Sequence, residues 1–136
     1  MSCLSAAPDW LKQPKDAIGP ESDRLLLVEP GPSLAPLIQQ FPGGVSMIYC
    51  RFTTISPEFV RRVAPDCILS PIVARQFDIV DLVRLLDRCN YRGSVVAVTD
   101  PLPAPTMVLT ELRRFNRRLD MSLLELASAG GRRLHT

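Results

Sequence analysis

A short apolar segment near the middle of the chain most constrains its fold. Residues 65–71 read Pro-Asp-Cys-Ile-Leu-Ser-Pro, so prolines bound a brief apolar run. A run of this length without polar alternation is typical of a strand buried on both faces, as at the centre of a parallel sheet. Sites in such sheets form beyond the carboxyl ends of the strands. The end of this strand, Ser70 followed by Pro71, therefore bears on function.

Helices and further strands are predicted to alternate on both sides of this segment. The predicted strands are residues 24–29, 45–52, 66–70, 94–99 and 120–126, and the predicted helices are residues 33–41, 57–64, 78–90 and 106–118. For the last strand, an extension of the preceding helix is the alternative. Each crossover is long enough for a right-handed parallel connection. The pattern predicts a doubly wound α/β sheet of five parallel strands in flavodoxin-like order 2-1-3-4-5.

The chain is predicted to hold one domain between two flanking segments. The 136 residues suffice for one core. We assign residues 24–126 to the domain, 1–23 to an N-terminal arm and 127–136 to a flexible tail. Because the tail leaves little room for a final helix, one sheet face is expected to be partly bare, and the arm or a second subunit would cover it, the latter giving a homodimer. Trp10 in the arm is a candidate anchor for a partner, with packing on its own domain as the alternative.

Composition excludes several classes of protein. The longest apolar stretches fall far short of the ~20 residues that span a bilayer, and the first residues lack the pattern of a secretory signal, so we expect a cytoplasmic protein. The net charge of +2 does not by itself argue for nucleic-acid binding. The four cysteines form no Cys-x-x-Cys pair and His135 is the single histidine, so no zinc site is expected. No Gly-x-Gly-x-x-Gly or Walker loop occurs, and we expect no cofactor.

The predicted helix over residues 106–118 combines an apolar side with a basic side. Val108, Leu112 and Phe115 are expected to be buried. The outward positions form an arginine patch: Arg113, Arg114, Arg117 and Arg118. This patch is a candidate surface for nucleic acid or an acidic partner, and a solvated helix face is the alternative.

The loop before that helix is rich in proline. Residues 101–105 read Pro-Leu-Pro-Ala-Pro, which favours a stiff, extended connection. With Leu102 exposed, this loop is a candidate docking ridge for a partner. A stiff connector without a binding role is the alternative.

The carboxyl ends of the predicted strands gather polar side chains at one edge of the sheet. Glu29, Ser70, Thr99 and Asp100 form the candidate strand-end site. Glu29 and Asp100 are candidates for a catalytic pair, with structural roles at loop starts as the alternative. Ser70 lies outside any Gly-x-Ser-x-Gly motif and His135 lies in the tail, so no catalytic triad is predicted.

Three segments of the chain follow one another in the order of a known domain family. Residues 24–41 read RLLLVEPGPSLAPLIQQF, residues 65–71 read PDCILSP and residues 94–100 read SVVAVTD. They resemble, in turn, the first strand and helix, the Pro-Asp-Leu-x-Leu-x-Asp strand and the fourth strand of the receiver domains of bacterial two-component response regulators. The resemblance spans residues 24–126 at the level of element order. It implies a receiver-like fold and a role in signal transduction.

The resemblance carries over only part of the receiver's phosphorylation site. Glu29 matches the first of the paired acids that hold Mg²⁺ in receivers, but Pro30 replaces the second. Pro71 aligns with the phospho-acceptor aspartate, Thr99 matches the hydroxyl residue, and residues 120–136 contain no lysine. Aspartyl phosphorylation needs a carboxylate nucleophile and a divalent ion. The resemblance therefore implies a degenerate receiver that is not phosphorylated in the usual way.

Two functions of different classes follow from these observations. The first is a non-enzymatic pseudo-receiver that acts as a signalling or protein-interaction module through its surface. Its candidate contact residues are Trp10, Leu102, Arg113, Arg114 and Arg117. The second is a small-molecule binder or minor enzyme of flavodoxin-like shape that uses the strand-end site.

Overall fold

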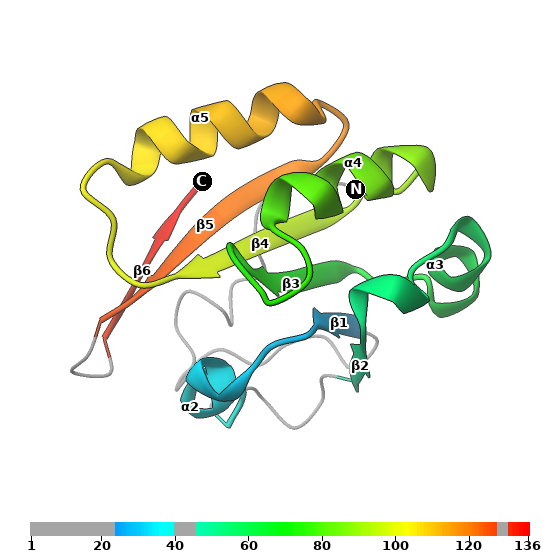
Figure 1. Cartoon of the computed structure of the whole chain (residues 1–136), viewed down its shortest axis with the longest axis horizontal. Coiled ribbons are helices and arrows are strands. Elements are labelled where there is room, and N and C mark those ends of the chain that lie inside the picture. The colour runs from blue at the N-terminus through cyan, green and yellow to red at the C-terminus, as the bar shows by residue number, and fades with distance from the viewer. Residues whose placement is uncertain (1–23, 40–45, 128–130) are drawn as a thin grey trace.

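One mixed sheet of six strands forms the centre of the molecule. The computed structural model describes residues 24–39, 46–127 and 131–136. The sheet has the order β2-β1-β3-β4-β5-β6, in which β6 runs antiparallel to β5 and the other neighbours are parallel (Figure 1). The strands are β1 (Arg24–Val28), β2 (Ser46–Cys50), β3 (Cys67–Pro71), β4 (Ser94–Thr99), β5 (Asp120–Leu126) and β6 (Arg132–His135).

The predicted α/β class and the parallel order 2-1-3-4-5 are confirmed, and the count of five strands is wrong. β6 falls in the segment that the sequence assigned to a flexible tail. Its pairing with β5 runs from Leu126↔Arg132 to Leu123↔His135, and the amide of Ala127 donates to the carbonyl of Gly131 at 2.9 Å. A strand of four residues with one apolar side chain, Leu134, has no alternation that a pattern can detect.

Four α-helices connect the strands. They are α2 (Ala35–Ile38), which follows a 3₁₀ turn at Pro32–Leu34, α3 (Pro57–Val63), α4 (Ile79–Arg88) and α5 (Pro105–Phe115). α3 and α4 each begin after a residue whose side chain caps the helix N-terminus. The Ser56 hydroxyl accepts from the Phe59 amide at 3.1 Å, and Asp78 and Asp81 form a reciprocal capping box. α2 is shorter than the helix predicted for residues 33–41, of which residues 40 and 41 lie outside the described residues.

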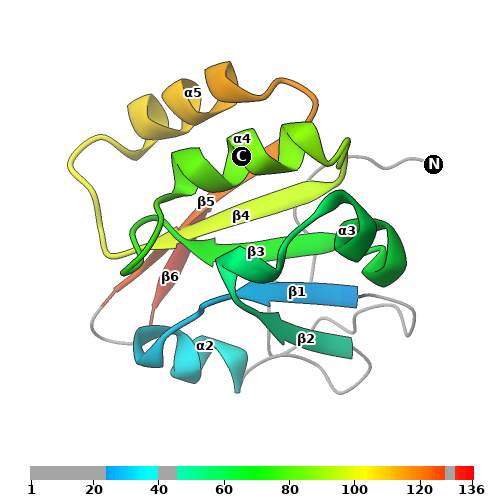
Figure 2. The same ribbon diagram turned by 45° about the vertical axis from the view of Figure 1, so that its right-hand side comes forward.

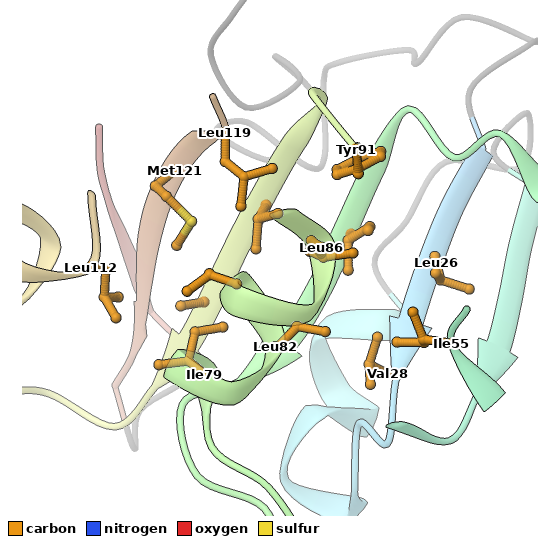
Figure 3. Packing of buried hydrophobic residues seen from close by; sticks show 14 of the residues in the cluster. Leu26, Val28, Ile55, Ile79, Leu82, Leu86, Tyr91, Leu112, Leu119 and Met121 are labelled. Carbon is orange, nitrogen blue, oxygen red and sulfur yellow. The ribbon is translucent and has the colours of Figure 1, made fainter. Parts of the chain in front are cut away.

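The larger part of the core lies on the face of the sheet that α3, α4 and α5 cover (Figure 2). α4 lies over the middle strands, with its amphipathic pattern as predicted: the apolar side chains of Ile79, Leu82 and Leu86 are buried. Figure 3 shows these residues in one apolar cluster that extends from Leu112 of α5 to Leu26 and Val28 of β1. The alternation of side chains along each strand sends every second residue to this face.

The opposite face carries a second apolar cluster under α2. Leu34 and Leu37 pack there with buried residues from β1, β3, β4 and β5. The strand residues are Leu25, Leu27, Cys67, Leu69, Val96, Val98 and Leu124. The predicted cover of this face by the N-terminal arm involves residues 1–23, which lie outside the described residues, as does Trp10.

None of the helices in the described ranges combines the length and the apolar character that crossing a bilayer requires.

Candidate functional site at the strand ends

The strand-end residues predicted from the sequence lie at one edge of the sheet but are spread across it. Glu29 follows β1, Ser70 lies in β3, and Thr99 ends β4. Because neighbouring strands are about 4.8 Å apart, the ends of β1 and β4 are separated by roughly 10 Å with β3 between them. Glu29 and Asp100 therefore lie along the same edge of the sheet, but they are too far apart to form a contacting pair of carboxylates.

Ser70 is closed off from solvent. Its exposed fraction is 0%, and its hydroxyl donates to the carbonyl of Pro71 at 2.9 Å. This hydrogen bond satisfies a polar group that would otherwise be costly to bury. Ser70 consequently offers no group to a ligand that approaches the edge from solvent.

Glu29 anchors the chain after the neighbouring strand. Its backbone adopts a left-handed conformation, φ 43°, and its amide donates to the carbonyl of Cys50 at 3.0 Å. Its carboxylate oxygen Oε2 accepts the amide of Phe52 at 2.9 Å, which is the first residue of the 3₁₀ turn Phe52–Thr54. Among the described residues, no hydrogen-bond donor reaches the other oxygen, Oε1. Glu29 thus has one oxygen in use and one available.

Two open hollows meet at Glu29. The first, which we call the β1–β3 hollow, has a volume of about 550 Å³. Its lining residues are Glu29, Pro30, Gly31, Pro32, Pro71, Val73, Ala74 and Arg75. After β1 the chain crosses to the face of the sheet that α2 covers, and after β3 it crosses to the face that α4 covers. Doubly wound sheets bind ligands at this position, between the two strands. Glu29 and Arg75 are the charged groups of this hollow, so a ligand there would meet one carboxylate and one guanidinium.

The second hollow, which we call the β2 hollow, lies on the other side of Glu29. It has a volume of about 560 Å³ and is lined by Glu29, Tyr49, Cys50, Arg51, Thr54 and Phe59. Burial, together with the negative charge of Glu29, raises the pKa of the Cys50 thiol to about 11. A thiol of that pKa stays protonated near neutral pH and is a poor nucleophile. Cys50 therefore behaves as a small apolar residue.

Thr99 and Asp100 belong to the predicted strand-end site, but they lie outside the two hollows at Glu29. Thr99 is half-buried and Asp100 is exposed. No hydrogen-bond partner of the Asp100 carboxylate is found in the part of the chain that the structure describes. The strand-end site is therefore centred on Glu29, with Pro71 beside it.

A carboxylate on β5 was missed by the sequence interpretation. Glu125 is buried, its Oε2 accepts the amide of Leu102 at 2.7 Å, and its Oε1 lies 2.8 Å from Nε2 of His135. The bond from Leu102, and then that from His135, hold the pKa of Glu125 below its usual range. The signal in the sequence is an acid inside a mostly apolar strand, in phase with the apolar residues Met121 and Leu123. The sequence could not identify His135 as the partner of Glu125, because β6 was not predicted.

The proline loop is fixed to the sheet by this same carboxylate. The expected exposure of Leu102 is wrong: the side chain is half-buried and packs against the main core, and the amide is bound to Glu125. Burying the apolar side chain and satisfying the amide both favour the inward position. Leu102 is therefore a poor candidate for a docking ridge.

The arginine patch lies at the opposite edge of the sheet, where β5 begins. The predicted end of its helix at residue 118 is wrong: α5 ends at Phe115, so Arg113 and Arg114 lie on the helix and Arg117 and Arg118 lie in the loop that leads to β5. Its four arginines are exposed as predicted. The expected burial of Phe115 is wrong: the ring is 38% exposed, and the guanidinium of Arg84 lies 5.0 Å from its centroid. Leu109 takes the buried place in the helix instead, because it follows the i, i+3 spacing to Leu112.

The described residues contain no cluster of three or more histidine, cysteine, aspartate or glutamate side chains that could hold a metal ion. Cys67 and Cys89 are buried, and burial raises the pKa of the Cys89 thiol.

No family model matches the chain, and no curated protein matches it.

Proposed function

We propose that the chain is a non-enzymatic, receiver-like module for signalling or protein interaction that is not phosphorylated in the usual way. One observation carries the proposal: β3 ends at Pro71, paired with Val98 of β4, at the central position of a parallel sheet. The resemblance to receivers places the phospho-acceptor aspartate at this residue. A proline has no oxygen with which to attack a phosphoryl group.

The surroundings of Pro71 support the same reading. A divalent ion at this edge would need several oxygen ligands. Glu29 supplies one carboxylate, of which one oxygen is bound to the amide of Phe52, and Pro30 follows it where the resemblance requires an acid. The edge therefore has neither the nucleophile nor the charge that phosphoryl transfer needs.

Incubation with acetyl phosphate and Mg²⁺ tests the proposal. We expect intact-mass spectrometry to find no acid-labile phosphate on the protein. A Pro30→Asp, Pro71→Asp variant is the matched control, because it restores carboxylates beside Glu29 and should acquire stabilisation by Mg²⁺ in a thermal-shift assay. Stoichiometric labelling of the unaltered protein would overturn the proposal.

The module is proposed to act in the cytoplasm as a homodimer. β2 is an edge strand, and its Met47 and Tyr49 are exposed on the face of the sheet that carries Leu25 and Leu27. Exposed apolar side chains beside an unpaired strand edge favour association. Size-exclusion chromatography with light scattering should give twice the monomer mass, and a Tyr49→Lys variant should give the monomer mass.

A second candidate function is the binding of a small ligand at the strand ends. The observation that favours it is the pair of hollows at Glu29, with the oxygen Oε1 available to a donor group. A thermal-shift screen of nucleotides, flavins and cationic metabolites tests it. Stabilisation by several degrees that is lost in a Glu29→Gln variant would favour this function over the first.

A further inference from the structure

A hollow of about 370 Å³ lies at the end of α5, where the chain enters β5. It is lined by Arg113, Arg114, Arg117 and Leu119, and we call it the arginine hollow. We infer that the arginine hollow binds an acidic segment of a partner protein, one in which carboxylate side chains flank an apolar residue. This inference rests on the proposed role as an interaction module and names the chemistry of its partner.

The three guanidinium groups differ in how they are held. Nη2 of Arg113 donates to the carbonyl of Met121 at 3.1 Å, a contact that fixes the side chain without neutralising its charge. Nη1 of Arg114 lies 3.1 Å from Oε2 of Glu111 in an exposed pair. Arg117 has no ion-pair or hydrogen-bond partner among the described residues. The hollow therefore presents more positive than negative charge from groups that are partly fixed in place.

Carboxylates match this arrangement in charge and geometry. The planar guanidinium group donates two parallel hydrogen bonds to a carboxylate, and such charge-assisted pairs are stronger than neutral ones. Asp120, the first residue of β5, accepts from the hydroxyl of Ser94 at 3.4 Å; burial raises its pKa, while this hydrogen bond and the charge of Arg113 lower it. Asp120 therefore interacts with one arginine of the hollow, and no pairing of Asp120 with Arg114 or Arg117 is found among the described residues.

The apolar part of the hollow favours a protein partner. Leu119 is the apolar residue in its lining and is buried in the main core, where Figure 3 shows it near Met121. Phe115, on the last turn of α5, is partly exposed, but Arg84 covers its ring at 5.0 Å. An aliphatic side chain between two acids would reach Leu119 while its neighbours pair with the arginines.

Nucleic acid fits the same surface less well. Single strands bind along extended basic grooves with aromatic side chains on which bases stack, and the arginine hollow has no aromatic residue in its lining. A short peptide that pairs its carboxylates with the guanidinium groups needs no such stacking surface.

The end of α3 offers a matched control. It carries Arg61 and Arg62, of which Arg62 pairs with Glu58 at 3.2 Å, much as Arg114 pairs with Glu111. Arg61 lines a different hollow, but that hollow already contains the carboxylate of Asp66. Removing Arg61 and Arg62 changes the net charge as much as removing Arg114 and Arg117. Only the loss of Arg114 and Arg117 should weaken binding of the peptide.

The test measures binding of a fluorescein-labelled peptide, Glu-Glu-Leu-Glu-Glu-Leu-Glu-Glu, by fluorescence anisotropy at low salt. We expect saturable binding that an Arg114→Gln, Arg117→Gln variant weakens at least fivefold and an Arg61→Gln, Arg62→Gln variant changes less than twofold. Circular dichroism melts of both variants check that they fold. The substituted side chains are exposed, so both should melt close to the unaltered protein.

Three results would overturn the inference. They are no binding of the peptide at low salt, equal weakening by the two variants, and binding of labelled oligo-dT that is at least as tight and equally sensitive to the α5 variant. None of these results bears on the acetyl phosphate experiment. The failure of this inference is therefore distinguishable from a failure of the proposed function.

Discussion

Two glutamates at the carboxyl edge of the sheet make the same contact in different surroundings. Glu29 after β1 accepts the amide of Phe52 at 2.9 Å, and Glu125 near the end of β5 accepts the amide of Leu102 at 2.7 Å. Each carboxylate thereby ties its strand to the loop that follows the neighbouring strand. The second oxygen of Glu125 lies 2.8 Å from His135, whereas that of Glu29 has no donor among the described residues.

The difference separates a structural carboxylate from one that is available for binding. Glu125 is buried and both its oxygens are used within the fold, so its substitution should cost stability. Glu29 is half-exposed between two hollows, so its substitution should alter the local chemistry more than the stability. Variants of the two residues test this difference.

The largest effect is expected from Glu125→Ala. The substitution leaves the amide of Leu102 and the ring of His135 without their partner, and two segments lose their attachment to β5. We expect the melting temperature to fall by several degrees in calorimetry. Glu29→Ala should cost about 1 kcal/mol or less, because its single hydrogen bond is accessible to water. Equal losses in the two variants would contradict the contrast.

The pH dependence of stability should report the same carboxylate. Because the pKa of Glu125 is lower in the folded chain than its usual value, its contribution is present above the unfolded pKa of about 4.3 and is lost as the pH falls through the folded value. Asp120, whose pKa burial raises, acts in the opposite direction. We therefore expect the stability difference between the unaltered protein and Glu125→Gln to shrink between pH 7 and pH 3 in urea melts. A constant difference would show that the charge of Glu125 is unimportant.

A smaller effect is expected from His135→Ala. The substitution removes one partner of Glu125 and leaves the bond from Leu102 in place. β6 is the short edge strand that this histidine ends, so its amides should exchange faster while those of β4 keep their protection. Hydrogen exchange measured by mass spectrometry checks this. Unchanged exchange in β6 would mean that backbone pairing alone holds the strand.

The sequence predicted the part of the fold that apolar periodicity encodes. β4 and β5 appear at the predicted residues, and α3 begins at the predicted Pro57, because these features depend on short-range patterns. β6 was missed because its pairing comes from tertiary contacts, with Leu134 as its only apolar residue. The pattern placed Ser70 at the edge correctly but could not tell that its side chain is fully buried.

The smallest expected effect concerns the thiol beside Glu29. Burial is the main reason for the raised pKa of Cys50, and the charge of Glu29 adds to it. A Glu29→Gln variant should therefore lower this pKa and still leave it above the usual range of thiols, since the burial remains. Cys89 is an internal control, because burial raises its pKa and Arg88 lowers it, without a contribution from Glu29.

The measurement is the rate of iodoacetamide alkylation as a function of pH, followed for each cysteine by peptide mass spectrometry. We expect the profile of Cys50 to move to lower pH in the variant while that of Cys89 stays in place. Equal shifts at both cysteines would indicate a general loosening of the fold. No shift at either would mean that the Glu29 carboxylate is too well solvated to influence its neighbours, and its free oxygen would then be a weak basis for ligand binding at this edge.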